Sequence, residues 1–165
     1  MPCDNHKASS VIRRTRRARR PQPSRRSGCD KPGVLVVDED HLVRIMVQLG
    51  LERSGFDVWL ARNGREAIDL CRRHTEEIAV VLLDVQMPGL DGLQTLEALR
   101  NLNPEVLVCF MSSDTSAYKT EELRQQAAYC VIAKPFLLDD LTNILRLFAN
   151  GVPGDLLQSG GAFLG

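Results

Sequence analysis

Four short apolar runs, each followed by polar or charged residues, constrain the fold of this chain more than any other feature. The clearest run, Val80 to Leu83, is apolar at every position, leads into Asp84 and is followed by a turn at Pro88-Gly89. A strand of this kind is buried on both faces of its sheet, as in parallel sheets that helices cover. Asp84 is therefore expected where such a sheet opens to solvent.

The other three runs end in the same way. Val34 to Val37 precedes Asp38-Glu39-Asp40, Val106 to Met111 precedes Ser112-Ser113, and Val131 to Ala133 precedes Lys134-Pro135-Phe136. If the strands are parallel, their carboxyl ends meet at one edge of the sheet. An acidic pair, a single aspartate, a hydroxyl and an ammonium then share one crevice, and this set suits phosphoryl chemistry on an aspartate.

Strand and helix patterns alternate between residues 32 and 150. Strands are expected at 34–38, near 57–61, and at 79–84, 106–111 and 130–133. After the first strand, Leu42, Ile45, Met46 and Leu49 recur at helical spacing, and Gly55 ends the pattern. Helical patterns also follow the other strands, including one near 116–127. Five strands alternating with five helices predict an α/β fold with right-handed crossovers and a parallel sheet covered on both faces.

Charge divides the chain into two parts. Residues 1–31 carry ten Lys or Arg against two acidic residues, a formal +8, and the rest of the chain carries −8. The first 31 residues contain few apolar side chains and include Pro21 and Pro23, so we expect a disordered basic arm. Residues 151–165 hold five glycines and are expected to form a flexible C-terminal tail. The folded domain is then 32–150.

The basic arm has several interpretations that the sequence leaves open, among them an Arg-rich transit peptide. A run of like charges is commonly a solvated appendage. Clustered arginines can also neutralise nucleic-acid phosphates without a fold, so a nucleic-acid contact through the arm stays an alternative. The arm contains no aromatic residue on which a base could stack, which argues against sequence-specific recognition.

Apolar runs and cysteines indicate the compartment. No apolar run approaches the roughly 18 to 20 residues that cross a bilayer, so a cytoplasmic protein without membrane contact is expected. The five cysteines are an odd number and include no C-x-x-C pair, which argues against a zinc site. Cys109 and Cys130 lie in or beside apolar strands and are interpreted as small buried side chains in a reducing cytosol.

Several motifs in one order resemble the CheY-like receiver domain of two-component response regulators, over about 115 residues from Val34 to Phe148. They are Asp38-Glu39, the motif D-x-x-M-P-G-x-D-G from Asp84 to Gly92, Ser112, and Lys134-Pro135-Phe136, each after its own strand. The resemblance implies a flavodoxin-like (βα)5 receiver, a five-stranded doubly wound parallel sheet with strand order 2-1-3-4-5.

The same resemblance implies a phosphoacceptor and a metal. Asp84 would accept the phosphoryl group from a sensor histidine kinase or a histidine phosphotransfer protein. Magnesium is the implied cofactor, held by Glu39, Asp84, the backbone carbonyl of Gln86 and, through water, Asp38. Such a domain is not an enzyme in the usual sense, because it catalyses only its own phosphorylation and dephosphorylation.

Two further side chains are implied to contact the phosphoryl group. Lys134 would hold one oxygen as a mobile point charge, and the Ser112 hydroxyl would hold another. The Lys134-Pro135 peptide is expected to be cis, as in the family. The chain is interpreted as a stand-alone response regulator whose downstream protein target binds the face of the fourth helix, fifth strand and fifth helix.

One departure from the family concerns the readout of phosphorylation. An aromatic residue often lies three residues before the lysine and swings inward on phosphorylation, but Val131 occupies that position here. Tyr129 points to the same face by strand alternation, nearer the start of the strand. We therefore expect a readout that does not depend on a rotating ring.

Alternatives exist for single residues and for the whole chain. Asp38 and Glu39 could be helix N-caps, for which Asp40 is as good a candidate, and Asp84 could cap the turn before the next helix. A haloacid dehalogenase-type phosphatase also combines aspartate, hydroxyl, lysine, an acidic pair and magnesium. In that family the acidic pair follows the lysine, whereas Lys134 comes last here. The other alternative is a nucleic-acid-binding protein whose arm binds and whose receiver is regulatory or inert.

Overall fold

The computed structural model describes residues 31–113 and 130–150. In these ranges five strands form one parallel sheet of order β2-β1-β3-β4-β5. The strands are β1 (Gly33–Val37), β2 (Asp57–Ala61), β3 (Ile78–Asp84), β4 (Leu107–Ser112) and β5 (Cys130–Ala133). The helices are α1 (His41–Arg53), α2 (Gly64–Arg73), α3 (Gly92–Leu102) and α5 (Leu138–Ala149). The predicted fold class and strand order are confirmed.

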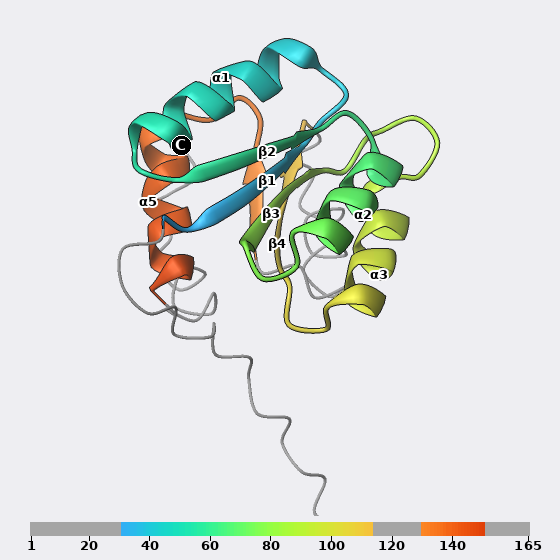
Figure 1. The fold of residues 1–165 in the computed structure, drawn as a ribbon. Helices are drawn as coiled ribbons and strands as arrows, with labels where there is room; N and C mark the ends of the chain where they lie inside the picture. Colours follow the sequence, from blue (N-terminus) through green and yellow to red (C-terminus); the bar gives the residue numbers. More distant parts are fainter. Residues whose placement is uncertain (1–30, 114–129, 151–165) are drawn as a thin grey trace, which may run out of the picture.

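Helices cover both faces of the sheet (Figure 1), with α1 and α5 on one face and α2 and α3 on the other. The inner strand β1 is buried at every position, because alternate side chains enter opposite layers. Val34 and Val36 pack into the α1 and α5 layer, and Leu35 and Val37 into the α2 and α3 layer. Each such side chain contributes about 1.5 to 3 kcal/mol through burial. The sheet is thus a rigid support for residues at its edge.

The apolar residues whose spacing predicted α1 lie mostly on the outer side of that helix. Leu42, Met46 and Leu49 are 72%, 59% and 56% exposed. The sheet instead buries Val47 and Leu51, which also have helical spacing. Two apolar stripes therefore run along one helix, and periodicity alone does not say which one the sheet covers.

The end of α1 follows the predicted signal. Gly55 has a φ of +89°, a conformation that favours glycine, and its N–H donates to the Glu52 carbonyl. The chain then enters β2 through the buried Phe56. Gly55 therefore ends the helix and turns the chain back to the sheet.

Some predicted features lie outside the described residues: the basic arm up to residue 30, the helix near 116–127, Tyr129, and the tail at 151–165. Within 31–113 and 130–150, no helix has the length and apolar character needed to span a bilayer.

Candidate functional site

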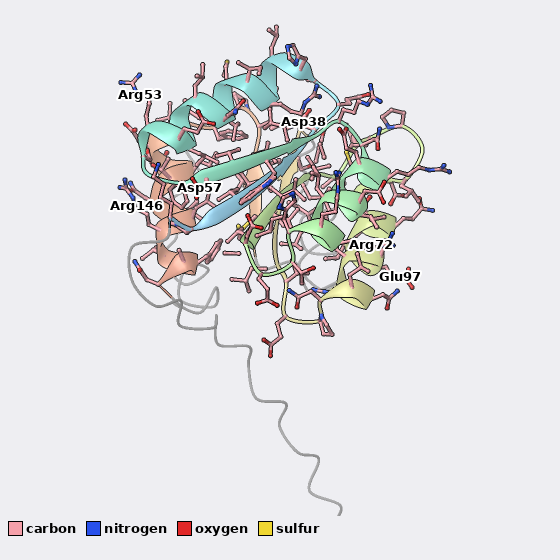
Figure 2. All side chains as sticks on the ribbon, in the orientation of Figure 1. Asp38, Arg53, Asp57, Arg72, Glu97 and Arg146 are labelled. Atoms are coloured by element: carbon pink, nitrogen blue, oxygen red, sulfur yellow. The ribbon has the colours of Figure 1, made fainter. Side chains whose placement is uncertain are left out.

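Asp38 and Asp84 meet at the carboxyl-terminal edge of the sheet, between β1 and β3, where the strand order reverses. Val37 lies beside Leu83 in the register of β1 and β3, so the two aspartates that follow reach the same edge. From this edge α1 goes to one face of the sheet and α3 to the other. Figure 2 shows Asp38 at the end of β1, at the opposite end of the sheet from Asp57, where β2 begins. Such a reversal leaves a crevice in doubly wound folds.

Lys134 joins the two buried carboxylates. Its Nζ lies 2.6 Å from Asp38 Oδ2 and 3.1 Å from Asp84 Oδ2. Asp38 is 1% exposed and Asp84 is 6% exposed. Buried charges are costly unless a partner compensates them, so the shared ammonium is what allows two carboxylates to stay side by side.

The pKa values reflect this arrangement. Burial raises the pKa of the Asp84 carboxyl; Lys134 lowers it and Asp38 raises it, and the net pKa lies above its ordinary value. Burial by itself lowers the pKa of Lys134, but the hydrogen bonds and charges of Asp38 and Asp84 outweigh this effect and raise it. Lys134 is therefore a cation at neutral pH, beside a carboxylate that burial makes more basic.

The loop between β1 and α1 is held by its own hydrogen bonds. Asp38 Oδ1 accepts from the Asp40 N–H at 2.8 Å, and Arg44 Nη1 donates to the carbonyls of Asp38 at 2.6 Å and Glu39 at 2.9 Å. Asp40 caps α1 by accepting from the Leu42 N–H at 2.8 Å. The cap alternative is thus confirmed for Asp40 and wrong for Asp38 and Glu39.

Arg44 is a positioning residue that the sequence interpretation missed. Its guanidinium binds the backbone of both members of the acidic pair from the first turns of α1. The sequence does contain a signal for this role. Arg44 is a basic residue on the helix that follows the acidic pair, five positions after Glu39 and six after Asp38. That spacing lets a long side chain reach back over the helix N-terminus.

Asp84 is held by the turn that follows it. Its Oδ1 accepts from the Gln86 N–H at 3.2 Å. Asp84 therefore caps this turn, as the alternative for this residue allowed, while the N-cap of α3 is Asp91, in a capping box with Gln94. Gly92 packs directly on the strand end, where an added Cβ would lie 2.8 Å from the Asp84 carbonyl oxygen.

Ser112 and Lys134 arrive from β4, which pairs with β3, and from β5, which pairs with β4. Met111 lies beside Asp84 in the register of β3 and β4, and Ser112, the next residue, is buried. Ser112 pairs with Ala133, and its carbonyl accepts from the Lys134 N–H at 2.8 Å. The Lys134-Pro135 peptide is cis, as predicted. A hydroxyl, an ammonium and two carboxylates thus share one edge of the sheet.

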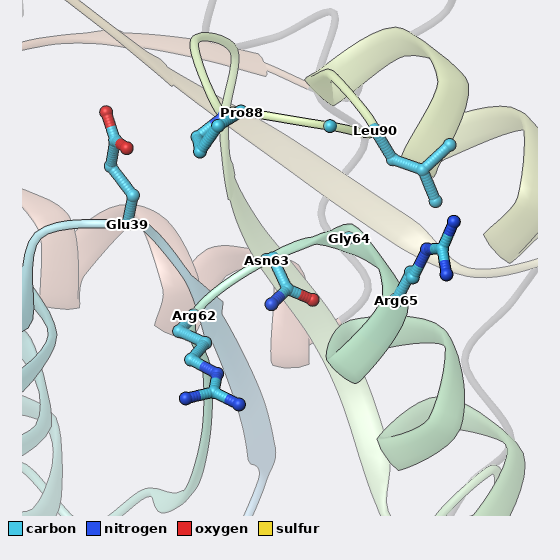
Figure 3. Close-up of a pocket in the computed structure, with 8 residues that line it drawn as sticks. Glu39, Arg62, Asn63, Gly64, Arg65, Pro88 and Leu90 are labelled. Atoms are coloured by element: carbon cyan, nitrogen blue, oxygen red, sulfur yellow. The ribbon is translucent and has the colours of Figure 1, made fainter.

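Glu39 and Gln86 lie at the protein surface, unlike the buried residues Asp38, Asp84 and Ser112. Both are exposed. Glu39 lines a cavity of about 370 Å³ formed by the loops after β1, β2 and β3, together with Arg62, Arg65 and Pro88 (Figure 3). Across the described part of the chain, no three acidic, histidine or cysteine side chains gather as a ready metal site. The structure brings together Asp38, Asp84, Ser112 and Lys134 and leaves the Glu39 side chain at the surface.

The sequence of this chain matches the family model of the response regulator receiver domain over residues 34–146. This chain belongs to the response regulator receiver family. The transcriptional regulatory protein PrrA of Mycobacterium tuberculosis is 35% identical over 115 residues, which cover 70% of this chain and 48% of that protein. Sporulation initiation phosphotransferase F of Bacillus subtilis is 25% identical over 115 residues, 70% of this chain and 91% of that protein. This receiver thus spans about half the length of its PrrA relatives.

Solved structures agree with this assignment. The Vibrio cholerae chemotaxis protein CheY4 has a TM-score of 0.66 and 28% identity, covering 71% of this chain and 98% of its own. The receiver domain of the Francisella response regulator 1452 has a TM-score of 0.67 and 29% identity, covering 73% and 98%. Membership of the receiver family decides against the haloacid dehalogenase alternative.

Proposed function

We propose that this receiver accepts a phosphoryl group on Asp84 in a magnesium-dependent reaction and signals through phosphorylation-dependent protein binding. The observation that carries the proposal is the convergence of Asp84, Asp38 and Lys134 at one edge of the sheet. A carboxylate oxygen of Asp84 attacks phosphorus in a phosphohistidine, the phosphorus–nitrogen bond breaks and an acyl phosphate forms. The donor is a sensor histidine kinase or a histidine phosphotransfer protein, and a small acyl phosphate can replace it.

The donor atoms fit a magnesium ion. Two buried carboxylates, those of Asp38 and Asp84, already face one cationic atom, Lys134 Nζ. Carboxylate and carbonyl oxygens are the ligands that magnesium prefers, and the set proposed here is Asp38, Glu39, Asp84 and the Gln86 carbonyl. When bound, the ion neutralises charge that would otherwise repel the incoming phosphoryl group.

The remaining residues act on the phosphoryl oxygens. Lys134 is a flexible point charge that can turn from the carboxylates to one phosphoryl oxygen. The Ser112 hydroxyl, buried at the end of β4, donates a hydrogen bond to another. Arg44 keeps the loop that carries Asp38 in place through its backbone hydrogen bonds. Each residue thus positions charge and leaves the covalent step to Asp84.

The phosphodonor protein docks on what we call the α1 apolar face, made of Leu42, Met46 and Leu49. These three side chains lie one and two turns apart on α1 and are all more than half exposed. The face begins at Leu42, three residues after Glu39. Leu137, three residues after Lys134, is also 70% exposed. Exposed apolar side chains in one stripe mark a surface that a partner helix can cover.

Phosphorylation then changes the population of two receiver states, and a downstream protein binds one of them better. We place that target on the face of β5 and α5, together with the helix predicted near 116–127, which lies outside the described residues. We place the exchange in the cytoplasm, a reducing compartment that suits the free thiols of Cys71, Cys109 and Cys130.

Incubation with acetyl phosphate and magnesium, followed by intact-mass measurement and site mapping, tests the proposed function. We expect one added phosphoryl group on Asp84, none in Asp84→Asn, and none in excess chelator. Asp91→Asn is a matched control, since it changes an acid of the same loop but keeps an N-cap residue. Uptake by Asp84→Asn at the wild-type rate contradicts the proposal.

A further inference from the structure

Cys109 and Cys130 face each other across the last two strands of the sheet. They are partners in the parallel register of β4 and β5. Both side chains belong to the layer that α1 and α5 cover. The Cys130 thiol donates to Cys109 Sγ, with 2.7 Å between the two sulfur atoms, and both cysteines are free thiols.

This placement satisfies the geometric requirements of a disulfide. Neighbouring strands of a sheet lie about 4.8 Å apart. A disulfide spans Cα atoms about 4.4 to 6.8 Å apart whose side chains point toward each other. Register partners project to the same side of a parallel sheet, so the sulfur atoms can join without a shift of either strand.

We propose that Cys109 and Cys130 form a reversible disulfide that joins β4 to β5, a modification site separate from the phosphoacceptor edge. The link would connect the two strands that lead to Ser112 and Lys134. It would also close the segment between residues 109 and 130 into a covalent loop. Cytosolic disulfides of this kind are transient and redox-sensing, so the pair fits a reversible modification.

The two thiols differ in access, which orders the reaction. Cys130 is half-buried, whereas Cys109 is fully buried. Burial, and then the hydrogen bond with Cys130, raises the pKa of the Cys109 thiol well above its ordinary value. Cys130 therefore meets an oxidant first, and Cys109 acts second as the resolving thiol.

The reaction balances with a peroxide or a disulfide as the oxidant. With hydrogen peroxide, the Cys130 sulfur becomes a sulfenic acid and one water leaves. The Cys109 sulfur then displaces the second water and forms the disulfide. With oxidised glutathione, a mixed disulfide forms on Cys130 and Cys109 expels the second glutathione thiol. In both cases the two cysteines lose two protons and two electrons, which the oxidant takes up.

The test uses the full chain with Cys3, Cys29 and Cys71 replaced by serine, so that only the pair remains. After treatment with oxidised glutathione, the protein is denatured, alkylated and weighed. We expect a monomer lighter by two hydrogen atoms, with both alkylatable thiols lost and then recovered by dithiothreitol. Cys109→Ser in this background should stop at the mixed disulfide with glutathione. If the triple variant does not fold, non-reducing peptide mapping of the wild-type chain should find the Cys109–Cys130 link.

Other products overturn the proposal. These are two alkylatable thiols that persist after treatment, a disulfide between two chains, or a lasting glutathione adduct while Cys109 is present. Asp84→Asn should oxidise as the wild type does, because the pair makes no use of the phosphoacceptor. Failure of the proposed phosphoryl transfer therefore leaves this test unaffected.

Discussion

At the residue scale, Lys134 is the centre of the site. Its ammonium contacts both buried carboxylates, in the place where a divalent ion would neutralise them. An ion and an ammonium compete for such a place, because each compensates the same charge. Magnesium binding and the position of Lys134 should therefore be linked.

Replacement of Lys134 by alanine should destabilise the metal-free protein by about 2 to 3 kcal/mol at pH 7, because two buried carboxylates lose their partner. Magnesium should recover part of this loss, since it compensates the same charge. Urea unfolding with and without magnesium measures both effects, and Lys31→Ala, at an exposed lysine, is the control. An equal loss of unfolding free energy with and without magnesium would show that the ion does not compensate the carboxylates that Lys134 contacts.

The Asp84→Asn variant should be more stable than the wild type without metal at neutral pH. The folded protein holds Asp84 with a raised pKa, because of burial first and the charge of Asp38 as well, so ionisation of Asp84 opposes folding. The contribution of Asp84 to stability is then most favourable at low pH and falls as the pH rises through its folded pKa. Urea unfolding across pH should show the two proteins converge in acid and diverge toward pH 7. A difference that does not change with pH contradicts this origin.

At the element scale, the end of β3 depends on close packing with the helix that follows it, α3. Gly92 begins α3 against the backbone of Asp84 and Val85, and an added Cβ would lie 2.8 Å from each. Backbone cannot move aside as a side chain can, so the position of the strand end and the size of residue 92 are coupled.

Gly92→Ala should therefore lower the free energy of unfolding by about 1 to 3 kcal/mol, as overpacking does, and slow phosphoryl uptake by Asp84. Gly50→Ala is the matched control on α1. There the nearest atom, 2.9 Å away, is a methyl of the flexible Leu138 side chain, and alanine favours the helix by about 1 kcal/mol. Urea unfolding and the acetyl phosphate assay compare the two variants. Equal effects of the two substitutions would contradict the packing account.

Serine at the three positions of the α1 apolar face should change stability by only about 0.5 kcal/mol at each, since all are exposed. Phosphotransfer from a protein donor should become at least tenfold slower, while uptake from acetyl phosphate stays at the wild-type rate. Parallel assays with both donors measure this difference, with the exposed Arg53→Ser on the same helix as control. An equal fall with both donors would remove the docking role.

At the scale of the whole molecule, the basic arm and the rest of the chain carry equal and opposite formal charges. Residues 1–31 carry +8, and the remaining residues carry −8. Attraction between exposed charges is largely screened beyond about 8 Å at physiological salt. The acidic edge of the sheet is compensated locally by Lys134 and does not need the arm.

Deletion of residues 1–31 should accordingly leave the magnesium affinity of the receiver within about twofold at 0.15 M ionic strength. Titration of both proteins with magnesium measures this, and a large gain on deletion would identify the arm as an inhibitor of the site. The same pair of proteins tests the nucleic-acid alternative. Binding that falls steeply with salt and disappears with the arm would favour it.

The sequence by itself determined the order of the strands along the chain and the residues at their ends. A strand buried on both faces must be apolar throughout, so Asp84, Ser112 and Lys134 each stood out as the first polar residue after an apolar run. Parallel direction then placed them at one edge, which the structure bears out. Asp40 was recognisable as a cap because that signal is local.

Only the tertiary structure decided the contacts between residues far apart in the chain. Periodicity allowed two apolar stripes on α1, and the sheet buries the one with Val47 and Leu51. Register between β4 and β5 set Cys109 against Cys130, and the meeting of β1, β3 and β5 at one edge set Lys134 between two aspartates. Such contacts depend on how whole elements pack, because the free energy of burial depends on total area and shape and not on local spacing.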